Sequence, residues 1–196
     1  MTGNPPPRPA GAAGSAAADL ASVPAGTARP APLLRRLAAV AYEGLLLGAV
    51  LLIAGLLLAP AISPTPGVAD GRPLPIPSLP ARMLSFAAMF GVGALYCGWC
   101  WTGGRRTLPM KTWHMRLVLA DGGAVAPRTA LVRYCAAWIG PALALVSYAA
   151  MAPAGYARSA VGLLALNYAW ALVDPDRQFL HDRIAGTRLV LARPGP

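Results

Sequence analysis

The sequence predicts an all-α membrane protein: a four-transmembrane-helix bundle with a small cytoplasmic β element and a disordered N-terminal tail. Of the 196 residues, 56% are hydrophobic and only 12% are charged, and this charged share is about half that of an ordinary soluble domain. The charges fall in short clusters between long uncharged stretches. Too few charges remain to coat a water-facing surface, which argues against a water-soluble enzyme.

The net charge of +10 is a second indication of a membrane. A chain this basic would suggest a nucleic-acid partner if its charges covered one hydrophilic face. Here the basic clusters alternate with apolar stretches instead. We therefore expect the lipid bilayer, and no nucleic acid, as the partner that the charge serves.

The first predicted unit is a Pro/Ala-rich cytoplasmic tail, residues 1–32. Ala, Gly and Pro fill 21 of its 32 positions, and no apolar cluster is present to offset the entropy of ordering it. It also lacks the apolar core of a secretory signal. The second predicted unit, residues 33–193, is the membrane domain.

Two long apolar stretches begin the membrane domain. The first, about 37–59, contains one charge, Glu43, and the second, about 83–104, contains none. At about 1.5 Å per residue, each is long enough as a helix to cross a hydrocarbon core of roughly 30 Å. The segment 60–80 between them carries repeated prolines, which exclude a helix and predict a loop.

Two further apolar stretches follow. The third span is predicted at about 134–154 and the fourth at about 158–173. As an α-helix the fourth reaches only about 22 Å, so it spans only if Arg158 extends to the interface and the bilayer thins. The alternative is three spans, with the fourth stretch re-entrant or interfacial.

Two β patterns lie in the polar segments. Residues 114–120 are rich in β-formers and precede the turn signal Asp121-Gly122-Gly123, so residues 124–125 could begin a hairpin's return strand. In addition, the five residues 116–120 (RLVLA) recur as residues 188–192. The repeat could pair as a small sheet on one side of the membrane, or it could be chance in a chain rich in Leu, Val and Ala.

The basic residues predict the orientation. With four spans, 14 of them lie on one side, in the N-terminal tail, the 105–133 segment and the C-terminal segment, and 3 lie on the other. The positive-inside rule then places both termini in the cytoplasm. Three spans would put the C-terminal arginines outside, and this is the main reason to prefer four.

Glu43 is the one acid within an apolar stretch, about two turns into the first span. A carboxylate in lipid is costly unless it is neutral, hydrated or paired. Arg36 lies seven residues earlier on the same helical face, and Arg177, His181 and Arg183 are other candidate partners. Two interpretations remain open: a proton or cation site, or a buried ion pair that fixes helix register.

Small residues and thiols give weaker signals. Gly44, Gly48 and Gly55 lie on one helical face and predict close helix packing, including self-association. Cys97 and Cys100 form a Cys-x-x-Cys motif in an apolar helix with no charged partner nearby in sequence, so inert packing is favoured over a redox or metal site. We expect no metal, no cofactor and no catalytic residues.

Three segments resemble the RDD family of bacterial integral membrane proteins. They are residues 35–43 (RRLAAVAYE), 106–118 (RTLPMKTWHMRLV) and 180–190 (LHDRIAGTRLV), of which the last is the most specific. Two departures are Glu43, where the family usually has Asp, and Pro109, where it usually has Gly. The resemblance implies that Arg36, Glu43 and Asp182 are the signature residues, with Lys111 in a supporting position. Transport of ligands or ions is the activity usually suggested for the family.

Two hypotheses of function follow. The first is a small-solute or cation/proton transporter of the bacterial inner membrane that uses Glu43 as its intramembrane carboxylate and acts as a homo-oligomer. The second is a non-catalytic accessory or scaffolding protein, bound to a larger membrane partner, in which Arg36, Glu43 and Asp182 form a structural ion-pair network. A thiol oxidoreductase is a distant third.

Overall fold

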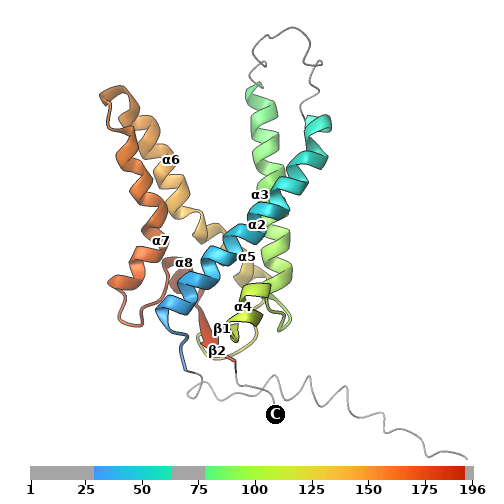
Figure 1. Ribbon diagram of the computed structural model, residues 1–196, viewed down its shortest axis with the longest axis vertical. Coiled ribbons are helices and arrows are strands. Elements are labelled where there is room, and N and C mark those ends of the chain that lie inside the picture. The colour runs from blue at the N-terminus through green and yellow to red at the C-terminus, as the bar shows by residue number, and fades with distance from the viewer. Residues whose placement is uncertain (1–28, 63–77, 193–196) are drawn as a thin grey trace, which may run out of the picture.

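A computed structural model describes residues 29–62 and 78–192 of the chain. The described part is mostly helical, and Figure 1 shows two helical pairs that rise and diverge from a common base. Helix α2 (Leu33–Ile62) packs on α3 (Leu79–Trp101) in one pair, and α6 (Ile139–Met151) packs on the 157–172 segment in the other. The base contains α4 (Leu108–Thr112), α5 (Pro127–Ala137), α8 (Leu180–Ala185) and two strands.

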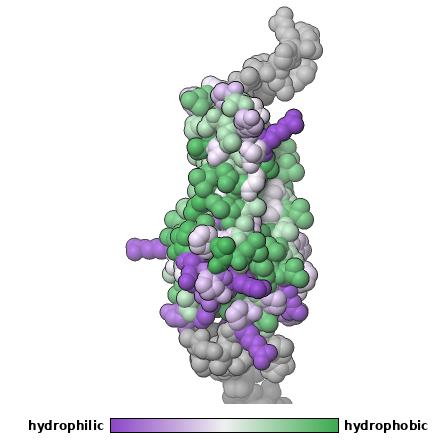
Figure 2. Space-filling model, turned by 90° about the vertical axis from the view of Figure 1, so that its left-hand side faces the viewer, coloured by the Kyte–Doolittle hydropathy of each residue, from purple (hydrophilic) through white to green (hydrophobic). Residues whose placement is uncertain are grey.

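Three helices in the described part are long and apolar enough to cross a membrane. They cover Leu33–Leu58, Leu79–Trp101 and Pro127–Ala154. Many of their large side chains are exposed, such as Leu45 at 75% and Leu57 at 76%, as expected for surfaces that lipid covers. Figure 2 shows hydrophobic residues over most of the body and hydrophilic residues gathered at the base. The predicted spans 37–59, 83–104 and 134–154 fall on these helices.

The third long helix has a break at Trp138, between α5 and α6. Pro141 lacks an N–H group, so the carbonyl of Ala137, four residues earlier, loses its usual helical donor. The Asn167 side chain supplies the missing hydrogen bond, with Nδ2 2.8 Å from that carbonyl oxygen. Next to the break, a Cβ at Gly140 would lie 2.8 Å from the Leu163 carbonyl oxygen. Glycine is therefore what lets the 157–172 segment approach α6 so closely.

The 157–172 segment corresponds to the predicted fourth span but is not one continuous α-helix. It consists of a 3₁₀-helix η2 (Ala157–Ala165), one turn of α7 (Leu166–Ala169) and a short 3₁₀-helix η3 (Trp170–Leu172). A 3₁₀-helix η1 (Ala152–Ala154) and Gly155, which has a positive φ of 78°, make the turn that precedes it. Figure 1 shows the segment running back along α6 toward the base.

The two strands form a small antiparallel sheet. Strand β1 (Met115–Leu119) pairs with β2 (Thr187–Leu191), with Leu117 opposite Leu189, so the repeated RLVLA segments do pair. The prediction that residues 124–125 form the return strand of a hairpin is wrong, because these residues form no strand. The predicted turn does form, and the Leu119 amide donates to the Gly123 carbonyl across it. Strand β2 has five residues with the same burial pattern as β1, in which the first, third and fourth residues are buried, whereas a two-residue return strand could pair with only part of β1.

The chain just before α2 lies along the free edge of β2. The Ala31 amide donates to the Leu189 carbonyl, and the Leu191 amide donates to the Arg29 carbonyl. Residues 29–32, which the sequence places in the disordered tail, are therefore part of the fold. The rest of that predicted tail, residues 1–28, and most of the predicted proline loop, residues 63–77, lie outside the described residues.

Candidate functional site

A buried ion pair lies where α5 meets α8 in the base. The Nε atom of Arg133 is 2.8 Å from Oδ1 of Asp182, and the two side chains are 5% and 1% exposed. The Thr187 hydroxyl donates to the same carboxylate oxygen over 3.1 Å. Arg133 also donates through Nη2 to Nε2 of the neighbouring His181, at 3.3 Å. We call Arg133, His181, Asp182 and Thr187 the polar cluster.

Aromatic rings enclose the polar cluster. The Arg133 guanidinium lies 4.3 Å from the centre of the Trp101 ring on α3, a cation–π distance. On the other side, the ring of Tyr168 stands edge-on to those of Phe179 and His181, with centroids 5.3 and 6.1 Å away. These rings exclude water, so the charges interact in a medium of low dielectric constant.

The charge state of the cluster follows from its surroundings. Burial raises the pKa of Asp182, but the adjacent Arg133 charge and the Thr187 hydroxyl outweigh burial and hold that pKa below its usual value. Burial lowers the pKa of His181 to about 4, with a smaller opposing effect from Asp182. At neutral pH the cluster therefore contains one cation, one anion and a neutral imidazole.

Glu43 lies above the cluster on α2, half-buried against α3. The hydroxyls of Tyr96 and Thr107 approach its carboxylate, and the charge of Arg133 acts on it from α5. Its Oε1 atom is buried and has no hydrogen-bond partner among the described residues. Thr107 occupies that position because it caps α4, with its side chain accepting from the Met110 amide.

A groove of about 220 Å³ joins Glu43 to the polar cluster. Most of its lining is apolar, and the polar groups that reach it include the side chains of Glu43, Arg133 and His181. Besides Oε1 of Glu43, Nδ1 of His181 is buried without a partner in the described part of the chain. If Nε2 of His181 accepts from Arg133, Nδ1 carries the proton. The residues that line the groove then hold one buried acceptor without a partner, Glu43 Oε1, and two such donors, His181 Nδ1 and Trp101 Nε1.

The sequence model of the RDD family matches residues 30–186. The chain belongs to the RDD family. Together with its apolar helices, this makes it a multi-pass membrane protein. Searches of curated proteins and of solved structures find no match to the chain.

Of the three residues that the family resemblance singles out, two lie near the groove and one does not. Glu43 lines the groove and Asp182 anchors the cluster below it. Arg36 is buried on the far side of the cluster, where it donates to the Arg177 carbonyl and lies 5.2 Å from the centre of the Phe179 ring. Arg36 was one candidate partner of Glu43, but its guanidinium instead bonds the Arg177 carbonyl in the 174–179 loop.

The supporting residues lie at three different places. His181 is in the cluster, whereas Arg183 is half-exposed and bonds Asp176 at 3.0 Å. Arg177 is exposed and offers its backbone carbonyl to Arg36. Lys111 is exposed on α4 and forms no ion pair within the described residues.

The glycines and thiols of the RDD chain do not build a site within the described residues. A Cβ at Gly44, Gly48 or Gly55 would meet nothing within 4 Å. Close helix packing at these glycines therefore stays a prediction, and it would involve a second protein molecule. The three cysteines are free, with Cys97 buried and Cys135 exposed. No group of three or more His, Cys, Asp or Glu that could hold a metal occurs in the part of the chain that the structure describes.

Arg133 is the functional residue that the sequence did not reveal. We predicted the third span to begin at residue 134, which places Arg133 in a polar loop. Helix α5 instead begins at Pro127, a residue favoured in the first helical turn, and this puts Arg133 nearly two turns inside the helix. Pro127 is the sequence signal that would have placed the predicted start of the helix earlier. With that start, Arg133 would have been a candidate partner for a carboxylate.

Proposed function

We propose that this RDD-family protein is a small-solute or cation/proton transporter in which Glu43 is the working carboxylate. The observation that carries the proposal is the groove, whose mainly apolar lining includes Glu43 and His181, each with a buried polar atom that has no partner among the described residues. A buried carboxylate oxygen without a partner costs about 1–3 kcal/mol, and a proton, a cation or a hydrogen-bonding solute bound at Glu43 would satisfy it. The Arg133–Asp182 pair also leaves Oδ2 of Asp182 without a hydrogen-bond partner among the described residues, but Asp182 does not line the groove.

The polar cluster gives Glu43 a fixed electrostatic background. Arg133 is held in place by Asp182, so its positive charge stays near Glu43 in every state of the carboxylate. This charge opposes a cation that binds at Glu43, which keeps binding weak enough for release. In this scheme the Arg133–Asp182 pair positions the site, and Glu43 is the group that changes partners.

We further propose four spans in the plasma membrane of a bacterium, with both termini on one side, and the order of the elements supports the number of spans. Strand β1 follows two of the long apolar helices, β2 follows the third, and the two strands pair. Paired strands lie on the same side of a bilayer if the 157–172 segment crosses back, and this supports a fourth span. The 3₁₀ geometry makes this feasible, because a rise of about 2.0 Å per residue extends the segment to about 30 Å. The positive-inside rule assigns that side to the cytoplasm.

Flux measurements on reconstituted vesicles test the transport proposal. The full chain is placed in liposomes that contain a pH-sensitive dye, and a Na⁺ or K⁺ gradient is applied. We expect proton flux that falls at least about tenfold in Glu43→Gln. The Glu43→Asp variant is the matched control, because it keeps the charge and has the residue more usual in the family, and it should retain most of the flux. Equal flux in Glu43→Gln and the wild type would exclude Glu43.

A scaffolding role is the second candidate, and the sealed Arg133–Asp182 pair favours it. In that case Glu43 only helps to join α2 to α3 and α5. Glu43→Gln would then lower the melting temperature of the protein, while no vesicle preparation would show flux. A larger membrane protein that co-purifies with the wild type and is lost with this variant would further support the scaffold.

A further inference from the structure

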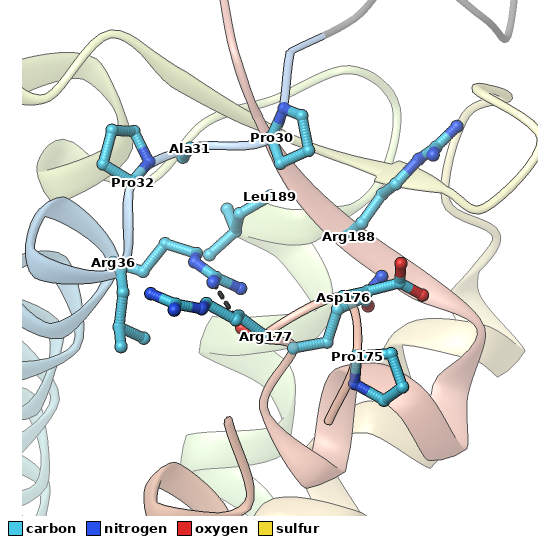
Figure 3. A pocket seen from close by; sticks show the side chains of 11 residues that line it. Pro30, Ala31, Pro32, Arg36, Pro175, Asp176, Arg177, Arg188 and Leu189 are labelled. Atoms are coloured by element: carbon cyan, nitrogen blue, oxygen red, sulfur yellow. Dashed lines mark hydrogen bonds between the residues drawn. The ribbon is translucent and has the colours of Figure 1, made fainter. Parts of the chain in front are cut away.

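A second cavity, of about 530 Å³, lies on the base beside the start of α2. Arg36, Arg177 and Arg188 line it, and Asp176 is the one acid among its lining residues. Figure 3 shows Arg36 reaching across the cavity toward Arg177, with Asp176 and Arg188 on the other side. This cavity is separate from the groove at Glu43, whose lining includes none of these four residues.

The charge in this cavity is mainly positive. Asp176 already forms an ion pair with Arg183, at 3.0 Å. The one acid in the lining therefore has an arginine partner that is not part of the lining. Arg36 is only 4% exposed, yet no carboxylate lies within ion-pair distance of it among the described residues. Its Nε atom is buried without a partner in the same part of the chain. Burying a guanidinium with an unpaired N–H donor costs folding free energy unless an anion accepts a hydrogen bond from it.

The backbone around the cavity adds to its affinity for anions. Pro32 and Leu33, at the amino end of the 30-residue helix α2, form one wall. The first turn of α2 contains no acidic residue, so the positive end of the helix dipole is not compensated there. Arg177 is held opposite, because Asp174 Oδ2 accepts from the amides of Asp176 and Gln178 at 3.1 and 3.0 Å.

The cavity also borders the surface that lipid covers. Arg36 lies in the first turns of a helix long and apolar enough to cross a membrane. The neighbouring Leu34 and Leu37 are 80% and 37% exposed, so acyl chains can lie against them while a headgroup enters the cavity. Basic pockets at this depth bind anionic headgroups.

We propose that this cavity binds the phosphate group of an anionic phospholipid, with Arg36 and Arg177 as its ligands. Guanidinium groups suit phosphate because they donate two parallel hydrogen bonds to its oxygens. The lipid would join the start of α2 to the 174–178 loop. A soluble phosphate compound has the same recognition chemistry, and the experiment separates the two sources.

The test is a lipid titration of the purified full chain in detergent. The readout is the melting temperature as dioleoylphosphatidylglycerol, dioleoylphosphatidylcholine or inorganic phosphate is added. We expect phosphatidylglycerol to raise it at concentrations at least about tenfold lower than phosphatidylcholine, and phosphate to have no effect at millimolar levels. Stabilisation by phosphate equal to that by phosphatidylglycerol would overturn the lipid as the ligand, and equal effects of the two lipids would overturn the site.

Three variants assign the effect to this cavity. Arg177→Asn removes an exposed guanidinium but tolerates the positive φ of 51° at this position, and it should raise the required phosphatidylglycerol concentration at least about fivefold. Arg36→Gln should do the same where it folds. Arg35→Gln is the matched control, because Arg35 is exposed on the same helix and does not line the cavity. An equal loss in Arg35→Gln and Arg177→Asn would show a general surface-charge effect and overturn the site.

Discussion

Arg133 is the residue on which the base of the molecule depends most. Its guanidinium bonds Asp182, contacts His181 and stacks over Trp101, so it joins α5 to α8 and α3. Removing one member of a buried ion pair leaves the other charge buried without a partner, which costs about 3–5 kcal/mol in the free energy of unfolding. We expect Arg133→Gln to lose most of this in the free energy of unfolding, measured by thermal denaturation in detergent.

The control for this prediction is Arg128→Gln, because Arg128 is an exposed arginine on the same helix. It should melt within a degree or two of the wild type. The double variant Arg133→Met with Asp182→Leu should regain most of the stability, since apolar residues of similar size can replace a buried pair. Identical melting of Arg133→Gln and Arg128→Gln would show that the pair contributes nothing.

His181 makes stability depend on pH in a defined window. Its folded pKa is about 4, against an ordinary value of 6.5, so between these values the unfolded chain binds more protons than the folded one. Stability therefore falls as the pH is lowered from about 6.5 to about 4, by at most about 3 kcal/mol. His181→Asn should flatten a plot of melting temperature against pH in that window, and an unchanged slope in the variant would refute the assignment.

Asp182 acts in the same direction at lower pH. Its folded pKa is held below the ordinary value of 3.8, so its contribution is complete above that value and is lost as the pH falls through the folded pKa. The two residues act in adjacent pH ranges: His181 lowers stability between about 6.5 and about 4, and Asp182 lowers it below 3.8.

The sequence predicted some of these side chains and not others, for a physical reason. A carboxylate inside an apolar stretch is visible from composition alone, and so Glu43 was found. A buried arginine at the edge of a helix looks the same in sequence as an interfacial one, because burial depends on which elements pack around it. Arg133 is buried by α3 and α8, which lie far from it along the chain.

At the scale of elements, the break between α5 and α6 depends on one long-range hydrogen bond. Asn167 donates to the Ala137 carbonyl that Pro141 leaves free. We expect Asn167→Ala to destabilise the protein by about 1 kcal/mol, the size usual for hydrogen bonds between helices in membranes. In a Pro141→Ala background the helix can satisfy that carbonyl itself, so the same substitution should cost clearly less. A double-mutant cycle of melting temperatures measures the difference, and additive effects would contradict the coupling.

The elements themselves were predictable to different degrees. The long apolar helices follow from hydropathy over about 20 residues, which is a local property. The break at Trp138 and the 3₁₀ course of 157–172 were not predicted, because they arise from contacts such as Gly140 against the Leu163 carbonyl. The sheet pairing lies between these cases, since the RLVLA repeat indicated matching strands while the local turn pointed to a hairpin.

At the scale of the whole molecule, the sheet connects distant parts of the chain. Residues 29–31, β1 and β2 form a continuous hydrogen-bonded layer at the base, while the two helical pairs rise from it (Figure 1). The groove at Glu43 lies between the α2–α3 pair and α5, above this layer. Any change in how the pairs diverge would therefore alter the groove.

The sheet also leads to a prediction about how often the chain crosses the membrane. If β1 and β2 lie on one side, a cysteine at residue 120 and one at residue 192 share that side, and a cysteine at residue 154 lies on the other. We expect Ala120→Cys and Ala192→Cys to react with a membrane-impermeant maleimide only after cells are permeabilised, and Ala154→Cys to react in intact cells. Each is made with Cys97, Cys100 and Cys135 replaced by serine. A three-span chain would expose residues 154 and 192 together, and labelling of both in intact cells would contradict the four spans that we infer from the pairing of Leu117 with Leu189.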